Sequence, residues 1–136
     1  MSILDISNKL AVAGVKHIVV HAAASVPMSD DVKRGFEQYK DELVELGKKF
    51  HELEPEYYRE DVLSKVEYVD KQKYLGFLDD RSWRVYLDKA TGMMYESKSG
   101  PAPDLKRNIG LITNLKARKY AAGRHVYSIG AKGLDR

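Results

Sequence analysis

The chain contains no cysteine, so no disulfide can stabilise its fold and no thiolate can bind a metal ion or attack a substrate. This absence is typical of proteins from a reducing compartment. Long hydrophobic runs are also lacking, because the stretch over 11–24 is broken by Lys16, His17 and His21. Residues 1–10 do not form the basic region of a signal peptide. We expect a protein that does not enter a membrane and that works in the cytoplasm or elsewhere inside the cell, including within an assembled particle.

Sequence signatures of catalysis are absent as well. The glycines do not have the spacing of a phosphate-binding or dinucleotide-binding loop, and no serine lies in a nucleophile-elbow pattern. Glu37, Asp41 and Glu45 follow one helical stripe with lysines nearby, which is typical of a solvated face rather than an enclosed acid–base pair. We therefore expect no catalytic residues, no cofactor and no bound metal ion.

The chain does contain a strong helical pattern. Ser29 is a suitable N-cap, and Asp30 and Asp31 favour the first turn of a helix through its dipole. An apolar residue then recurs with alternating gaps of 4 and 3, which predicts a helix with one apolar seam at Val32, Phe36, Tyr39, Leu43, Leu46, Phe50 and Leu53. Four of these residues are candidates for a helix interface within the chain or between subunits: Phe36, Leu43, Leu46 and Phe50.

A second helix is expected directly after this one. Pro55 is well placed in its first turn, and an apolar face follows at Tyr58, Val62, Val66 and Val69. Two amphipathic helices joined by a short connection should form an antiparallel pair. This pair would provide the main cover of the first helix's seam.

The pattern then changes to that of a β-hairpin over 83–97. Apolar and polar residues alternate on both sides of Asp88–Gly92, a turn with Asp at its start and Gly where a positive φ is needed. Other segments predict a helix over 3–13, a strand over 15–22, a helix begun at Asp104 with Leu105, Ile109 and Ile112, and a strand over 125–129. We expect one α+β domain over 1–136, with the antiparallel helix pair packed against a small antiparallel sheet. Its parts are an acidic helical part at 27–73, a hairpin at 82–98 and a basic part at 99–136.

Two histidines at the ends of a β-branched run, His17 and His21, are an even number of residues apart and would share one face of a strand. The segment Lys16–His21 resembles the first core strand of zinc amidases that cleave peptidoglycan, and the likeness is confined to this segment. The resemblance implies a small hydrolase that uses His17 and His21. Because the sequence offers no third ligand at a recognisable spacing, structural histidines are the favoured reading.

Charge is distributed unevenly along the chain. Residues 27–70 contain 13 acidic and 7 basic residues, whereas residues 97–136 contain 9 basic and 2 acidic residues. The second segment predicts a positive surface for an anionic partner, formed by Lys106, Arg107, Lys116, Arg118, Lys119 and Arg124. Alternatively, the acidic segment of the same fold or of a neighbouring copy neutralises these cations.

Three functions follow from these observations. The first is a non-catalytic structural or assembly subunit of a larger complex, such as a virion-like particle. It would pack through the helix that carries the seam or through its termini, against copies of itself or other protein subunits, and its basic surface would contact an anionic partner. The second is a small nucleic-acid-binding module that acts through residues 97–136, with phosphate neutralisation by its cations and base stacking by its tyrosines. The third is the hydrolase.

Overall fold

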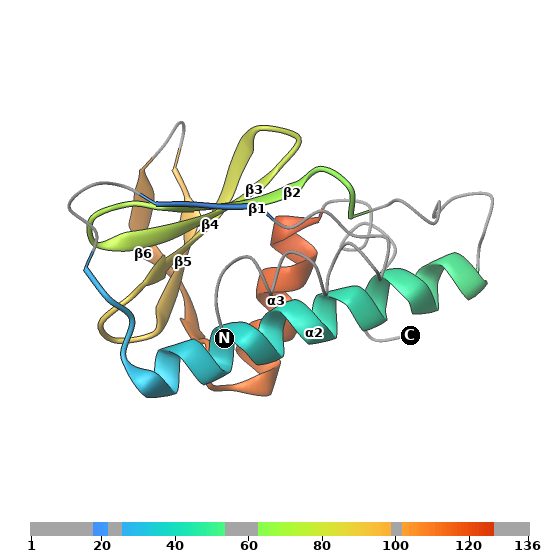
Figure 1. Ribbon diagram of the computed structural model, residues 1–136, viewed down its shortest axis with the longest axis horizontal. Coiled ribbons are helices and arrows are strands. Elements are labelled where there is room, and N and C mark those ends of the chain that lie inside the picture. The colour runs from blue at the N-terminus through green and yellow to red at the C-terminus, as the bar shows by residue number, and fades with distance from the viewer. Residues whose placement is uncertain (1–17, 22–25, 54–62, 99–101, 127–136) are drawn as a thin grey trace.

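The computed structural model of the chain describes residues 18–21, 26–53, 63–98 and 102–126, and its sheet has both described helices on one face (Figure 1). The six strands lie side by side in chain order. β1 pairs with β2 in parallel, and every later neighbour pairs in the antiparallel direction. The elements are β1 (Ile18–His21), α2 (Asp30–Leu53), β2 (Val66–Asp70), β3 (Tyr74–Asp79), β4 (Ser82–Asp88), β5 (Met93–Ser97), β6 (Pro103–Leu111) and α3 (Leu115–His125).

The long helix α2 is confirmed over the predicted residues. The Ser29 hydroxyl accepts the backbone N–H of Val32 at 3.4 Å, as expected for an N-cap. The seam is buried except at Leu46, which is half-buried, and at Leu53 at the end of the helix, which is 56% exposed. Within the core, the ring of Phe36 meets that of Tyr68 edge-on at 5.0 Å between centroids. Burial of this seam against the sheet is what holds α2 in place.

The expected antiparallel helix pair is wrong. Residues 63–65 form a turn, and β2 begins at Val66, so the sheet covers the seam of α2 instead of a second helix. Val66, Tyr68 and Asp70 are buried and alternate with half-buried neighbours, which is the period of a strand. β-Branched and aromatic side chains favour this pairing with β3 over the helical spacing of the valines. Pro55, with the rest of 54–62, lies outside the described residues.

The hairpin expected over 83–97 is confirmed as β4 and β5, with Tyr86 opposite Tyr95. In its turn the Asp88 carboxylate accepts the backbone N–H groups of Ala90 at 3.0 Å and of Thr91 at 3.2 Å. Gly92 has φ +83°, as the turn chemistry predicted. Local sequence therefore determines this part of the sheet.

The expected helix begun at Asp104 is also wrong, because residues 103–111 form strand β6 paired with β5. Gly110 has φ +126°, which interrupts the helical spacing of Ile109 and Ile112. The C-terminal helix is α3, which ends at His125, where a strand over 125–129 was expected. Residues 127–129 and the helix expected over 3–13 lie outside the described residues, whereas β1 lies within the strand expected over 15–22.

The opposite face of the sheet has no described helix on it (Figure 1) and carries an aromatic cluster. The rings of Trp83 and Tyr86 are stacked at 5.5 Å between centroids, and the ring of Tyr74 meets Tyr86 edge-on. The Lys71 ammonium lies 4.4 Å from the centroid of the Trp83 ring. These side chains shield Tyr86, which is buried, and burial raises the pKa of its hydroxyl to about 12.

Candidate interaction surface

The candidate surface comprises β6 and α3 and begins at an irregularity in β6. Ser97 of β5 pairs with Pro103, but Tyr95 pairs with Asn108, so residues 104–107 lie opposite a single residue of β5. The extra residues form a bulge in a strand that is the edge of the described sheet. Bulges of this kind interrupt the regular backbone pairing that an open edge would otherwise offer to another strand.

The bulge projects side chains of mixed character from the sheet. The Asp104 carboxylate accepts the backbone N–H of Lys106 at 3.1 Å, which stabilises the bend. Leu105, Lys106 and Arg107 are exposed as a consequence, and Leu105 is the most exposed large hydrophobic residue described, at 63%. The bulge thus displays an apolar side chain beside two cations.

Helix α3 follows β6 after a short turn and contributes the second half of the surface. The Asn114 side chain accepts the backbone N–H of Ala117 at 3.2 Å and caps the helix. One side of α3 packs into the protein through small residues such as Ala121 and Ala122. The other side exposes Leu115, Lys116, Lys119, Tyr120 and Arg124, and α3 contains no acidic residue. The exposed side of α3 is therefore positive along its length.

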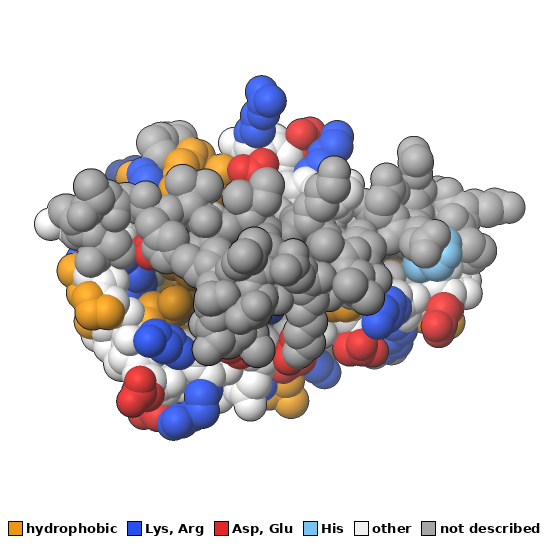
Figure 2. Space-filling model, viewed as in Figure 1, with side chains coloured by type: hydrophobic (Ala, Val, Ile, Leu, Met, Phe, Trp, Pro, Cys, Tyr) orange, Lys and Arg blue, Asp and Glu red, His pale blue; other side chains and the backbone are white. Residues whose placement is uncertain are grey.

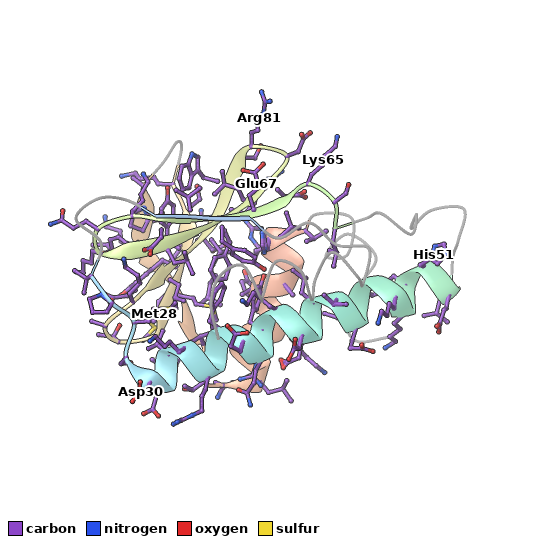
Figure 3. All side chains as sticks on the ribbon, viewed as in Figure 1. Met28, Asp30, His51, Lys65, Glu67 and Arg81 are labelled. Atoms are coloured by element: carbon purple, nitrogen blue, oxygen red, sulfur yellow. The ribbon has the colours of Figure 1, made fainter. Side chains whose placement is uncertain are left out.

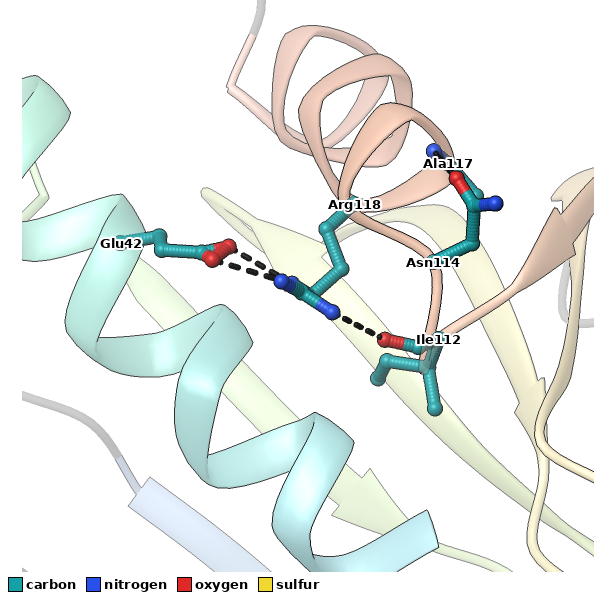
Figure 4. Close-up of polar contacts among 5 residues, drawn as sticks. All are labelled: Glu42, Ile112, Asn114, Ala117 and Arg118. Atoms are coloured by element: carbon teal, nitrogen blue, oxygen red, sulfur yellow. Dashed lines mark hydrogen bonds and ion pairs between the residues drawn. The ribbon is translucent and has the colours of Figure 1, made fainter. Parts of the chain in front are cut away.

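Arg118 differs from the other predicted surface cations because it is buried between the helices (Figure 4). Its Nε donates to both carboxylate oxygens of Glu42 on α2, at 2.6 and 3.0 Å. Its Nη1 donates to the backbone carbonyl of Ile112 at 3.0 Å. Arg118 connects α2, α3 and the turn before α3, so it belongs to the fold rather than to the solvent-facing surface.

The remaining five predicted cations are exposed. Arg107 lies 3.6 Å from the Asp104 carboxylate, and Arg124 Nε lies 2.6 Å from the carboxylate of Glu96 on β5. Lys106, Lys116 and Lys119 form no ion pair within the described part of the chain. Among the six predicted cations, α2 neutralises Arg118 alone in this part of the chain.

Between β6 and α3 lies an open groove of about 380 Å³. Ile109, Leu111, Ala117 and Tyr120 form its apolar lining, and Asn114 and Lys116 add polar groups. Gly110 belongs to the lining as well, and a Cβ on this glycine would lie 2.9 Å from the Cβ of Ala117. The absence of that carbon lets strand and helix approach closely at the bottom of the groove.

Most of the exposed large apolar side chains described belong to the two elements that form this groove. Leu105, Leu111, Leu115 and Tyr120 all belong to β6 or α3, and the other exposed large hydrophobic residues described are Val26 and Leu53. The charge pattern of the sequence predicts the cations of this surface but neither the groove nor the exposed leucines. The spacing of Leu105, Ile109 and Ile112 predicts a helix face, whereas these residues lie in β6 and in the turn that follows it.

The exposed side of α2 has a different character. In Figure 2, acidic and basic side chains intermingle along it. Glu45 lies 3.6 Å from Lys48, which is exposed, and the exposed Glu37 lies 3.1 Å from Lys40, whose side chain is buried. This is the solvated, locally compensated face that the sequence predicted for its acidic stripe.

The histidine of α3 is a core residue. His125 is fully buried, and its Nε2 lies 2.9 Å from the Leu78 carbonyl, which can only accept a hydrogen bond. Its Nδ1, 2.7 Å from the Tyr39 hydroxyl, therefore accepts from that hydroxyl in the neutral ring. Burial lowers the pKa of His125 to about 4, and burial raises the pKa of Tyr39 well above its usual value. Both groups are neutral at physiological pH and serve packing.

The histidines of the hydrolase hypothesis are not brought together by any described feature. His17 lies outside the described residues, and His21 is described only as a backbone position in β1. In the described ranges, no group of three or more histidine, aspartate or glutamate side chains could hold a metal ion.

In those same ranges, neither helix combines the length and the apolar character that crossing a membrane requires. Comparisons of the chain with protein-family models, with curated proteins and with solved structures found no match.

Proposed function

We propose that this protein is a non-catalytic assembly subunit that contacts an anionic protein partner through its β6–α3 surface. The supporting observation is the combination of an apolar groove with exposed lysines that have no described ion-pair partner. An apolar groove favours burial of a partner side chain, and the lysines around it favour carboxylates beside that side chain.

The leucines favour a protein partner over nucleic acid. Leu105, Leu111 and Leu115 are exposed within the surface. Protein interfaces bury such side chains at their centre, with polar groups at the rim. Phosphate and sugar groups would leave the leucines without apolar contacts. The assembly role therefore accounts for both the charge and the apolar character of the surface.

A nucleic-acid-binding module is the second candidate, and one observation favours it. Tyr120 is 51% exposed on the same side of α3 as Lys116, Lys119 and Arg124. An exposed ring between cations can stack on an unpaired base while the cations neutralise phosphates. In that case the logarithm of the affinity should fall linearly with the logarithm of salt concentration, with a slope of roughly −0.7 per phosphate contact on single strands.

Fluorescence anisotropy with two labelled probes, poly-L-glutamate and single-stranded oligothymidylate, tests the proposal. We expect poly-L-glutamate to bind the full chain and the Lys116→Glu, Lys119→Glu double variant to bind it at least about tenfold more weakly. The matched control is Lys33→Glu with Lys65→Glu, which changes the net charge equally at exposed positions outside β6 and α3.

The outcomes separate the two candidates. Binding of poly-L-glutamate that is weakened only by the double variant in α3 supports the assembly role. Binding of oligothymidylate alone, with the steep salt dependence described above, replaces it with the nucleic-acid role. Equal binding of the probes by the two double variants, or no binding of either probe, contradicts both the assembly role and the nucleic-acid role.

A further inference from the structure

We propose that the groove between β6 and α3 binds residues 52–61 of a second copy of this chain. This inference rests on the proposed function and names the anionic partner. It predicts that the chain assembles head to tail, because the groove and the segment that fills it belong to different parts of the molecule.

The groove defines the chemistry of its occupant. Its lining is mainly apolar, with Leu111, Ala117 and Tyr120 among the lining residues, so it suits an apolar side chain. Lys116 lies in the lining, Lys106 and Lys119 are exposed on the same two elements, and none of the three has a described ion pair. The occupant should therefore carry an apolar side chain flanked by several carboxylates.

Residues 52–61 have this composition. They contain five acidic residues against the single base Arg59, a net charge of −4, and no other ten-residue stretch of the chain is as acidic. The stretch begins at the end of α2, where Glu52 and Leu53 are exposed. Leu53 is also the more exposed of the two large hydrophobic residues described as exposed outside the β6–α3 surface. The sequence continues with Tyr57 and Tyr58, which provide further apolar surface.

The geometry of α2 keeps the start of this segment away from the groove of its own chain, which favours a segment from another copy. A Cβ on Gly35 would lie 2.9 Å from Ile112 Cγ2, so the N-terminal part of α2 packs beside the turn that connects β6 to α3. Leu53 lies 18 residues further along α2, which is about 27 Å at the rise of an α-helix. The C-terminal end of α2, near the labelled His51, projects past the strands and α3 (Figures 1 and 3). Leu53 therefore cannot enter the groove of its own chain.

A contact between a groove on one copy and a distant segment of the next closes as a dimer when two copies exchange segments about a two-fold axis. Otherwise it generates larger rings when the rotation closes and filaments when it does not. Each of these products is an assembly of copies of the chain. This is the behaviour expected of an assembly subunit.

Sedimentation velocity of the full chain with complementary charge-reversal variants tests the inference. The groove variant is Lys116→Glu with Lys119→Glu, and the segment variant is Glu60→Lys with Asp61→Lys. Each should weaken self-association at least about tenfold by itself, because attraction is replaced by repulsion. An equimolar mixture of the two should associate again, since each parental groove then meets a parental segment and each reversed groove meets a reversed segment. The Lys33→Glu, Lys65→Glu control should sediment like the parent.

Circular dichroism shows whether each variant is folded. Restored association in the equimolar mixture also requires that both variants are folded. A parent chain that remains monomeric at every concentration overturns the inference. So does weakening by the groove variant with no effect of the segment variant, which would assign the groove to a different occupant. In both cases a loss of poly-L-glutamate binding by the groove variant would still support the proposed function. Failure of that binding as well would remove the proposed function too.

Discussion

At the scale of single residues, the pH dependence of stability should depend on His125. The folded state lowers its pKa to about 4 from the ordinary 6.5, so below pH 6.5 the unfolded chain binds a proton that the folded chain does not. As far as it depends on His125, the free energy of unfolding has its full value above pH 6.5 and decreases as the pH falls toward 4. Between pH 7 and pH 5 the free energy of unfolding should decrease by about 2 kcal/mol through this group.

Urea denaturation at the two pH values measures this decrease. The His125→Gln variant has a side-chain amide that can still form hydrogen bonds but does not titrate. It should be less stable at pH 7 and should lose the contribution of His125 to the pH dependence. An equally steep decrease in that variant would show that other groups are responsible. Asp79, whose pKa is raised mainly by burial, works in the opposite direction and is present in both proteins.

A second prediction at this scale concerns Lys89, which is fully buried although it is a lysine. Its ammonium lies 2.5 Å from the Asp70 carboxylate and donates to the Lys71 carbonyl. Lys89→Met should lower the free energy of unfolding by about 3–5 kcal/mol, because the Asp70 carboxylate stays buried without that cation. Lys89→Met combined with Asp70→Asn should recover part of the loss. A single variant as stable as the parent in urea denaturation would contradict this account.

At the scale of elements, the stability of α2 should depend on its seam. Leu43 is fully buried, whereas Leu53 in the same helix is 56% exposed. Leu43→Ala should lower the free energy of unfolding by about 2–5 kcal/mol through lost burial and a residual cavity. Leu53→Ala should change it by no more than about 0.5 kcal/mol. Similar losses from both substitutions, measured in urea, would show that the seam is not the buried side of α2.

The elements also show which parts of the fold the sequence predicts. The α2 helix and the β4–β5 hairpin are predictable because local signals agree with their tertiary environment: the Ser29 cap and seam in one case, the Asp88 turn in the other. β2 and β6 are not predictable in this way. The spacing of their apolar residues suits a helix, but pairing with neighbouring strands makes both segments strands. Helix α3 packs mainly through alanines, which produce almost no amphipathic pattern.

The same distinction applies to the candidate site. The excess of basic over acidic residues in the C-terminal segment predicts that Lys106, Lys116 and Lys119 are exposed cations, because this excess can be read from the sequence without knowing the fold. It cannot distinguish Arg118, whose burial depends on Glu42, a residue 76 positions away. The groove is likewise invisible to sequence patterns, since it is created by the close approach of Gly110 to Ala117.

At the scale of the whole molecule, the chain combines a basic, partly apolar surface at β6 and α3 with an acidic segment beyond the end of α2. This polarity is the basis of the proposed head-to-tail assembly. Charge attraction brings copies together, and burial of apolar side chains in the groove sustains the contact. High salt should therefore weaken self-association, because exposed charges are screened.

The most direct measurement is photo-crosslinking from the groove itself. A benzophenone amino acid in place of Tyr120, in a mixture of ¹⁵N-labelled and unlabelled copies, lets mass spectrometry distinguish crosslinks within a copy from those between copies. We predict a crosslink between copies to a peptide that contains residues 52–61, and none when the same amino acid replaces Lys65. A crosslink only within one copy, to a different peptide, or to no peptide at all would contradict the claim that this groove holds the partner.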